Sequence, residues 1–337
     1  MDTWERARRA LHAAGLPAGA LGDCRSLGGG TYNTVEQLRL ADGTRLVLKI
    51  PPPPTVPGLA YERELLVAEA EFCRAAATAG VPAPKVVGPE AAPTDGHLLL
   101  THCPGTDAWG DLGPHEHAVV RRELGTMVAR LHRVTGPGFG YPSGALGPLA
   151  PDWRTAFTAM YDAVLADAHR YRAWLPRPAD EIARTAKAAY DALDEVTVPR
   201  LVHFDLWQGN ILVDTAGSAP RIGGLIDGER MFWGDPLADF VSLALLGDIR
   251  KDEHFLSGYQ EAGGEAEFTP TARRRLALYR SYLYLIMLVE TVPRAPGGDH
   301  VAWVRASVAP ELLSALDELA ELRGVTPPAP PSLRRGT

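Results

Sequence analysis

Apolar and polar positions change their spacing along the chain, and this change divides it into two unlike parts. Alternating apolar residues and turn signals crowd the first hundred positions, whereas helical spacing dominates the remainder. We therefore expect an α+β protein in which a small antiparallel-sheet lobe precedes a mainly helical lobe. The expected divisions are residues 1–104 for the first lobe, residues 105–325 for the second and residues 326–337 for a flexible, proline-rich tail.

A β-hairpin is predicted in the first lobe. Residues 35–40 and 45–50 alternate in polarity and flank Asp42-Gly43, a pair whose tolerance of positive φ angles favours a tight turn. Four prolines at residues 51–54 end the second strand, because proline has no amide hydrogen to donate to a neighbouring strand.

The helix predicted over residues 62–78 carries a carboxylate on its apolar face. Leu65 and Phe72 lie on one face by helical spacing, and Glu69 falls between them on that face. A buried carboxylate is costly unless it is paired, so we expect Glu69 to have a cationic partner. Lys49 in the preceding strand is the candidate; the alternative is a lysine that faces solvent.

Further elements follow from the same patterns. Residues 97–102 are predicted as a buried strand, and the turn at residues 103–105 is interpreted as the junction of the two lobes. Helical spacing of apolar residues predicts one helix around residues 120–131 and a longer one that begins at Thr269-Pro270.

Composition and charge narrow the class of protein. The chain has 337 residues, of which 46% are hydrophobic and 22% charged, so a wholly disordered chain is excluded. Lys and Arg number 34 against 41 Asp and Glu, a net charge of −7 that argues against a nucleic-acid partner. From Thr106 onward there are 24 basic and 30 acidic residues, which places −6 of that charge in the second lobe. This acidity either attracts a cationic small molecule or only keeps the surface hydrated.

The sequence shows neither membrane-spanning nor disulfide patterns, which predicts a cytoplasmic protein. The longest nearly uninterrupted apolar run, Leu283–Val289, is far shorter than the roughly 20 residues that cross a bilayer, so no membrane partner is expected. The first residues lack the apolar core of a signal peptide. Cys24, Cys73 and Cys103 have the spacing of neither a disulfide framework nor a metal site.

The strongest candidate for chemistry is HFDLWQGN at residues 203–210, followed by two short apolar segments and by Asp227. Asp205 and Asn210 on a tight loop can face one point, and Asp227 can return to it across a hairpin. This set suits phosphoryl transfer, in which one carboxylate accepts a hydroxyl proton while an amide oxygen and a second carboxylate hold Mg²⁺. The alternative is a chance occurrence, and the order and spacing of the residues argue against it.

A glycine cluster, LGGGTYNT at residues 27–34, precedes the first strand of the hairpin. Its backbone can approach phosphate oxygens without obstruction by side chains. The cluster lacks the spacing of a dinucleotide fingerprint or a P-loop, and ordinary turns also use such runs. Its candidate nucleotide contacts are Gly29, Gly30, Thr31 and Asn33.

This ordered set resembles the aminoglycoside phosphotransferase branch of the protein-kinase-like fold, whose members include choline, fructosamine, homoserine and methylthioribose kinases. The resemblance covers about residues 27–240. LVHFDLWQGNILV is similar to the family's catalytic loop and LIDGERMFWGDPLADF to its metal-binding segment. AEAEFCRAAATAGVPAPKV is similar to its helix and following turn. The resemblance implies a bilobal protein-kinase-like fold that uses ATP and Mg²⁺.

The resemblance also implies roles for single residues. Asp205 would be the catalytic base, and Asn210 and Asp227 would be the Mg²⁺ ligands. Lys49 would contact the nucleotide phosphates and pair with Glu69.

Other residues would support the site. By the same resemblance His203 would brace the catalytic loop, Asp239 would anchor it, and backbone groups near Thr101 and Cys103 would hold the adenine ring. Phe204 stands where protein kinases have arginine, which indicates a small-molecule acceptor rather than a protein.

The sequence gives a less specific signal for the residues that bind the acceptor. Glu290 lies on the apolar face of a long helix, where it either binds a substrate ammonium or pairs with an arginine such as Arg294. Glu229 is a further acidic candidate. Trp207 and Trp233 either form an aromatic wall for the acceptor or pack in the core.

We therefore predict an ATP-dependent O-phosphotransferase that acts on a hydroxyl of a small molecule, which would be cationic if the acidity of the second lobe selects the acceptor. The favoured acceptor is an antibiotic, either of the aminoglycoside type or another actinobacterial antibiotic, whose phosphorylation would give resistance. The alternative is a metabolic kinase for a fructosamine, choline, homoserine or an amino-sugar. A non-catalytic nucleotide-binding protein is a third reading, against which the presence of Asp205, Asn210 and Asp227 argues.

Overall fold

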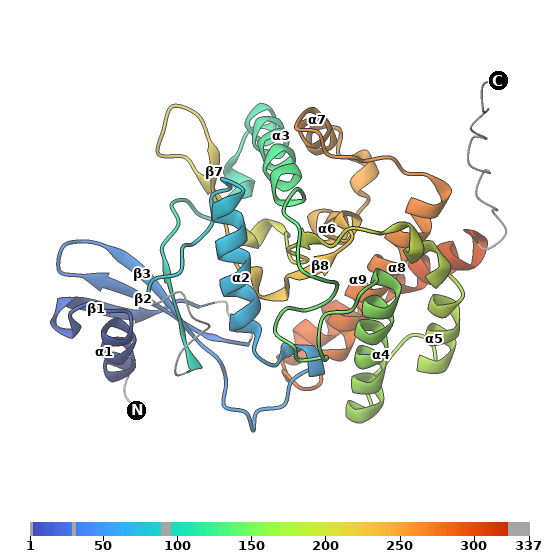
Figure 1. The fold of residues 1–337 in the computed structure, drawn as a ribbon, viewed down its shortest axis with the longest axis horizontal. Helices are drawn as coiled ribbons and strands as arrows, with labels where there is room; N and C mark the ends of the chain where they lie inside the picture. The colour runs from blue at the N-terminus through green and yellow to red at the C-terminus, as the bar shows by residue number, and fades with distance from the viewer. Residues whose placement is uncertain (1–2, 29–31, 89–95, 323–337) are drawn as a thin grey trace, which may run out of the picture.

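The computed structural model describes residues 3–28, 32–88 and 96–322. In this part of the chain, a four-stranded antiparallel sheet in the order β1-β2-β3-β4 precedes a mainly helical region, so the predicted α+β architecture is confirmed (Figure 1). The strands of the sheet are β1 (Leu21–Ser26), β2 (Thr34–Leu40), β3 (Arg45–Ile50) and β4 (Leu98–Thr101).

The predicted hairpin is formed by β2 and β3, which pair in antiparallel register. Gly43 has a φ of 88° in the turn, and the Asp42 carboxylate accepts a hydrogen bond from the Thr44 amide at 2.8 Å. Sequence patterns missed β1 and the first helix, α1 (Thr3–Ala13), which buries Leu11 with apolar residues of the sheet.

Helix α2 (Leu65–Thr78) begins three residues later than predicted. Glu64 has a left-handed backbone with a φ of 60°, which separates a short helical turn (Ala60–Glu62) from α2. The turn is held by α4 (Trp153–Tyr171), since the Tyr171 hydroxyl donates to the Gly58 carbonyl at 2.7 Å and Asp167 accepts from the Ala60 amide at 2.6 Å. Figure 1 shows α2 between the sheet and the helical region.

The helical region contains both helices that apolar spacing predicted. One is α3 (Pro114–Leu131). The other is α8 (Pro270–Val289), at whose start the Thr269 hydroxyl accepts from the Ala272 amide at 3.1 Å. None of the helices that the structure describes has the length and apolarity of a membrane-spanning segment. The helices here are α3 (Pro114–Leu131), α4 (Trp153–Tyr171), α5 (Ala179–Lys187), α6 (Asp239–Leu243), α7 (Glu253–Glu261), α8 (Pro270–Val289) and α9 (Gly298–Glu321).

Two small ribbons bring the candidate residues together. The predicted hairpin after the HFDLWQGN motif is formed by β6 (Ile211–Asp214) and β7 (Arg221–Leu225). A second ribbon pairs β5 (Arg200–Val202) with β8 (Phe232–Gly234). The motif therefore lies beside the segment that carries Asp227, and the Ile226 amide donates to the Asn210 carbonyl at 2.9 Å. The predicted tail at residues 326–337 lies outside the described residues.

Candidate active site

The loop that carries Asp205 has a strained turn held by a buried carboxylate. Phe204 adopts a φ of 63°, a conformation that costs a side-chain-bearing residue about 1–2 kcal/mol. Asp239 is fully buried and accepts from the His203 amide at 3.1 Å and the Phe204 amide at 2.6 Å. His132 Nε2 lies 2.9 Å from the same carboxylate. These contacts give Asp239 the geometry of a loop anchor.

His203 joins the same loop to the segment before Asp227. Its Nδ1 accepts from the Asp205 amide at 3.2 Å, so its Nε2 carries the proton and donates to the Ile226 carbonyl at 3.0 Å. The ring stands edge-on to Phe72 of α2, with centroids 4.6 Å apart. Burial lowers the pKa of His203, which keeps the imidazole neutral as this bonding requires.

The Asp205 carboxylate can reach an acceptor, because its side chain is 26% exposed. Burial raises the pKa of Asp205, and the guanidinium of Arg230 opposes that rise, with its Nε 3.8 Å from Oδ2. The Asn210 amide nitrogen donates to the Asp205 carbonyl at 2.9 Å, which leaves the amide oxygen to face a cation. Sequence reasoning missed Arg230; its only signal was a basic residue inside an otherwise apolar and acidic run.

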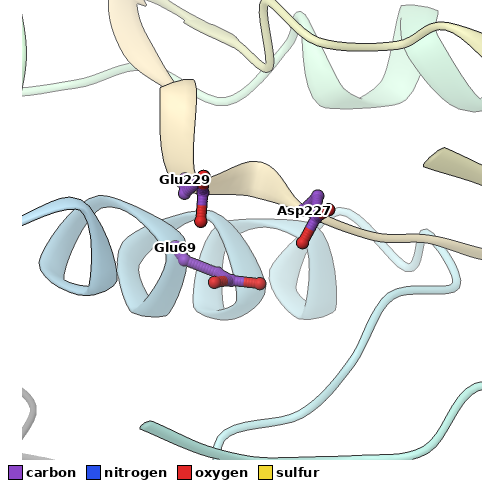
Figure 2. A group of neighbouring side chains, drawn as sticks. All are labelled: Glu69, Asp227 and Glu229. Atoms are coloured by element: carbon purple, nitrogen blue, oxygen red, sulfur yellow. The ribbon is translucent and has the colours of Figure 1, made fainter. Parts of the chain in front are cut away.

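Lys49 is buried in β3 and faces three carboxylates. Its ammonium lies 2.6 Å from Glu69 Oε1, bonds to Asp227 Oδ1 and is 3.9 Å from Glu229 Oε2. The predicted pairing of Lys49 with Glu69 is confirmed, and the alternative of a solvent-facing lysine is wrong. Figure 2 shows Glu69 on α2 and the other two carboxylates on the segment that faces it.

The charges of this cluster favour a divalent cation. Burial raises the pKa values of Glu69 and Glu229. Burial would also raise the pKa of Asp227, but the Lys49 ammonium outweighs it and holds that pKa below its usual value. Oxygens of the three carboxylates lie within 4.8 Å of one another, and one ammonium leaves an excess of two negative charges when all three are ionised. Carboxylate and amide oxygens are the ligands that Mg²⁺ prefers, so Asp227, Asn210 and Glu229 suit this ion.

Glu229 belongs to this cluster rather than to an acceptor pocket. Its Oε2 accepts a hydrogen bond of 2.6 Å from the side-chain amide of Asn33, at the end of the glycine cluster. The expectation that Glu229 contacts the acceptor is therefore corrected: the carboxylate accepts from Asn33 and lies in the cluster around Lys49. The other candidates of the glycine cluster, Gly29, Gly30 and Thr31, lie outside the described residues.

The residues predicted to bind the acceptor differ in their exposure and in their partners. Trp207 is 46% exposed two residues from Asp205, where it can offer a ring face. Trp233 is only 3% exposed and packs so closely on Gly136 that no Cβ would fit there, so the prediction of an acceptor wall is wrong for this residue. Glu290 Oε2 is 2.9 Å from Arg230 and 3.3 Å from Arg294, as the pairing alternative predicted.

Of the backbone groups predicted to hold adenine, the Thr101 amide is bonded within the protein, and the other groups stay a prediction. Thr101 donates its amide hydrogen to the Lys85 carbonyl at 2.9 Å, and its hydroxyl accepts from the Lys85 amide at 2.9 Å. That amide is therefore occupied within the protein and does not serve adenine. Cys103 is buried against Gly224 of β7, and the role of its backbone stays a prediction.

Comparison with known proteins agrees with this geometry. The sequence model of the phosphotransferase enzyme family matches residues 23–279. A candidate ketoamine kinase from Lactiplantibacillus plantarum is 29% identical over 214 residues, which are 61% of this chain and 69% of that protein. The crystal structure of a candidate fructosamine-3-kinase from Thermobifida fusca has a TM-score of 0.66 at 22% identity, covering 94% of this chain and 100% of that one.

A further solved structure contains a nucleotide. The ternary complex of APH(2″)-IIa with streptomycin and ATP has a TM-score of 0.57 at 16% identity, covering 91% of this chain and 97% of that one. At this level of identity these structures establish a shared fold. The protein-kinase-like architecture that the sequence resemblance implied is therefore confirmed.

Proposed function

The chain belongs to the phosphotransferase enzyme family, and on that premise we propose that it transfers the γ-phosphoryl group of ATP to a hydroxyl of a ketosamine, a ketose that carries an amine. The observation that carries the proposal is the convergence of Asp205, Asn210 and Asp227 beside buried Lys49. Likeness to a candidate ketoamine kinase supports this class of acceptor.

In this proposal each side chain has a role in phosphoryl transfer. The acceptor oxygen forms a bond to the γ-phosphorus as the bond to the ADP oxygen breaks, and the hydroxyl proton passes to the Asp205 carboxylate. Lys49 would contact the phosphates while it stays paired with Glu69, and Asp227 and Asn210 would hold the cation. When bound, Mg²⁺ neutralises charge on the phosphates. These residues act by positioning and by charge compensation.

The acceptor side favours an amine-bearing sugar. Apart from the cluster around Lys49, the carboxylates of Asp205, Glu290 and Glu62 face two guanidinium groups, which leaves an excess of one negative charge; the guanidinium groups are those of Arg230 and Arg294. An excess of negative charge attracts a cationic acceptor, and the exposed face of Trp207 suits a sugar ring. An ATP-consuming reaction and three free cysteines are consistent with a cytoplasmic setting.

An acceptor panel tests the proposal. We expect ATP-dependent addition of one phosphate, seen by mass spectrometry, to fructoselysine and related ketosamines. Asp205→Asn should abolish transfer, and Asp299→Asn, the same change at an exposed site on α9, should not. Transfer to aminoglycosides with none to ketosamines would refute the proposed acceptor and favour the antibiotic reading. Transfer that survives Asp205→Asn would remove Asp205 as the base.

A further inference from the structure

Arg230 has unused hydrogen-bond donors beside the base. Its guanidinium contacts Glu290 Oε2 at 2.9 Å, and its Nε lies 3.8 Å from Asp205 Oδ2, which is too far for a hydrogen bond. Within the described residues, the bond to Glu290 is the only hydrogen bond that this side chain makes. An arginine side chain has five N–H donors. Most of the donors of Arg230 are therefore available to a ligand.

The available donors are accessible at the same place as the base. The side chain of Arg230 is 10% exposed and that of Asp205 is 26% exposed. Fully buried arginine nitrogens without a hydrogen bond occur in the described residues, such as Nε of Arg273 and of Arg280, but none of them belongs to Arg230. Its free N–H groups are therefore not enclosed in the core, and an oxygen that approaches Asp205 also approaches them.

Arg230 is held by the helical region rather than by the cluster around Lys49. Glu290, which contacts the guanidinium, directly follows the last residue of α8. Glu229, the residue before Arg230, has a different partner, because its carboxylate lies 3.9 Å from the Lys49 ammonium. The nucleotide phosphates are expected at Lys49, so these two neighbouring side chains serve different ends of the site. This division favours the acceptor rather than the phosphates as the ligand of Arg230.

A carboxylate and a guanidinium at this separation can bind two oxygens of one molecule. The hydroxyl that reacts donates its hydrogen to Asp205, and an oxygen on the adjacent carbon accepts from Arg230. We propose that Arg230 binds the oxygen next to the reacting hydroxyl and thereby restricts the acceptor to molecules with oxygens on adjacent carbons, an inference that rests on the proposed function. This contact needs no charge on the acceptor, so it is compatible with an amine elsewhere in the molecule.

The proposal separates the classes of acceptor. Every sugar hydroxyl of fructoselysine has an oxygen on an adjacent carbon, whereas the single hydroxyl of choline or of homoserine has none. A molecule of the second kind would take water away from the guanidinium without replacing its hydrogen bonds, and a site built around a hydrogen bond rejects a molecule that lacks the partner. Choline and homoserine should therefore be poor acceptors.

Acceptor binding is measured by calorimetry on the full chain loaded with Mg²⁺ and AMP-PNP, an ATP analogue that does not transfer its phosphate. We expect Arg230→Met to weaken fructoselysine binding about 10- to 100-fold and to leave the affinity for AMP-PNP nearly unchanged. Arg305→Met is the matched control, since this exposed arginine of α9 stacks on Trp174, and it should alter neither affinity. Wild-type affinity for fructoselysine in Arg230→Met would overturn the proposal. A loss confined to AMP-PNP binding would place the guanidinium on the phosphates and would overturn it as well.

A lysine at this position separates recognition from charge. Arg230→Lys keeps a positive charge beside Asp205 and Glu290, so folding and AMP-PNP binding should persist, but its single ammonium lacks the planar fork of a guanidinium. We expect fructoselysine binding to stay at least about fivefold weaker than in the wild type. Full recovery of binding would show that only the charge matters, and the proposal would be wrong.

Analogues of fructoselysine that each lack one oxygen locate the contact. In the wild type, removal of the oxygen bound by Arg230 should weaken binding about 10-fold or more, and in Arg230→Met the same removal should cost little. Equal losses in the two proteins for every analogue would contradict the proposal. Turnover of choline or homoserine at the rate of fructoselysine would contradict it too.

Failure of the proposed function would be recognised separately. If the wild type phosphorylates an aminoglycoside and no ketosamine, the proposed acceptor is wrong. Arg230→Met is then titrated with that aminoglycoside, because many of its ring hydroxyls also have oxygens on adjacent carbons. Weakened binding would support the role of Arg230 in acceptor recognition, and unchanged binding would refute it.

Discussion

Replacement of Asp239 by asparagine tests the support of the catalytic loop. The native carboxylate accepts from the amides of His203 and Phe204, and it does so without water, because Asp239 is fully buried. An asparagine has the same shape but only one accepting oxygen, and its NH₂ group would face an amide hydrogen. Asp239→Asn therefore breaks one of the two backbone bonds and leaves its donor unsatisfied.

The cost follows from these contacts. A hydrogen bond to a charged group contributes about 1.5–3 kcal/mol, and a stranded buried amide costs about 1–3 kcal/mol, so the free energy of unfolding should fall by about 2.5–6 kcal/mol. Unfolding entropy is about 2.1 cal/mol/K per residue, or about 0.7 kcal/mol/K for 337 residues, so Tm should drop by about 4–8 °C. Phe204, at a φ of 63°, would relax and carry Asp205 with it, so kcat should also fall.

Calorimetric Tm and steady-state kinetics provide the assay. The matched control is Asp152→Asn, which makes the same change at the cap of α4, where the carboxylate accepts from the Thr155 amide at 2.8 Å. Asparagine caps helices as well as aspartate does, so this control should leave Tm nearly unchanged. If Asp239→Asn lowered Tm by less than about 1 °C and kept the wild-type kcat, the carboxylate would not be what holds the strained turn.

Two other changes are informative. Burial raises the pKa of Glu69 to about 8, and the Lys49 ammonium opposes that rise, so Lys49→Met should raise the pKa of this carboxyl further. The extra loss of stability in the variant should therefore grow as pH rises above about 8, and denaturant titration should show a larger deficit at pH 9 than at pH 6. An equal deficit at both values would contradict this. Arg230→Met removes the cation beside Asp205, so the pKa of the base should rise further and the acid limb of the pH profile of kcat/KM should move to higher pH; an unmoved limb would count against Asp205 as the titrating base.

Features that depend on local periodicity could be predicted from the sequence. The hairpin of β2 and β3 follows from alternation and from one turn dipeptide. The pairing of Lys49 with Glu69 follows from the cost of a carboxylate on an apolar helix face, and no knowledge of the distance between the two elements was needed.

Features that depend on distant partners could not be predicted. Trp233 is buried because Gly136, almost a hundred residues earlier, leaves room for its ring. Arg230 matters because Glu290 and Asp205 converge on it from other elements. The late start of α2 depends on the left-handed backbone of Glu64, a conformation that no glycine or asparagine signals.

The tie between α4 and the turn before α2 has a consequence for control. Because Gly58 and Ala60 are bonded to α4, and because Phe72 of α2 packs on Gly228, contacts within the protein itself hold the helix that carries Glu69. Enzymes regulated by a swinging helix are switched on when such a pair is assembled. Here Lys49 and Glu69 are paired, so under the proposed function activity would not require a movement of α2.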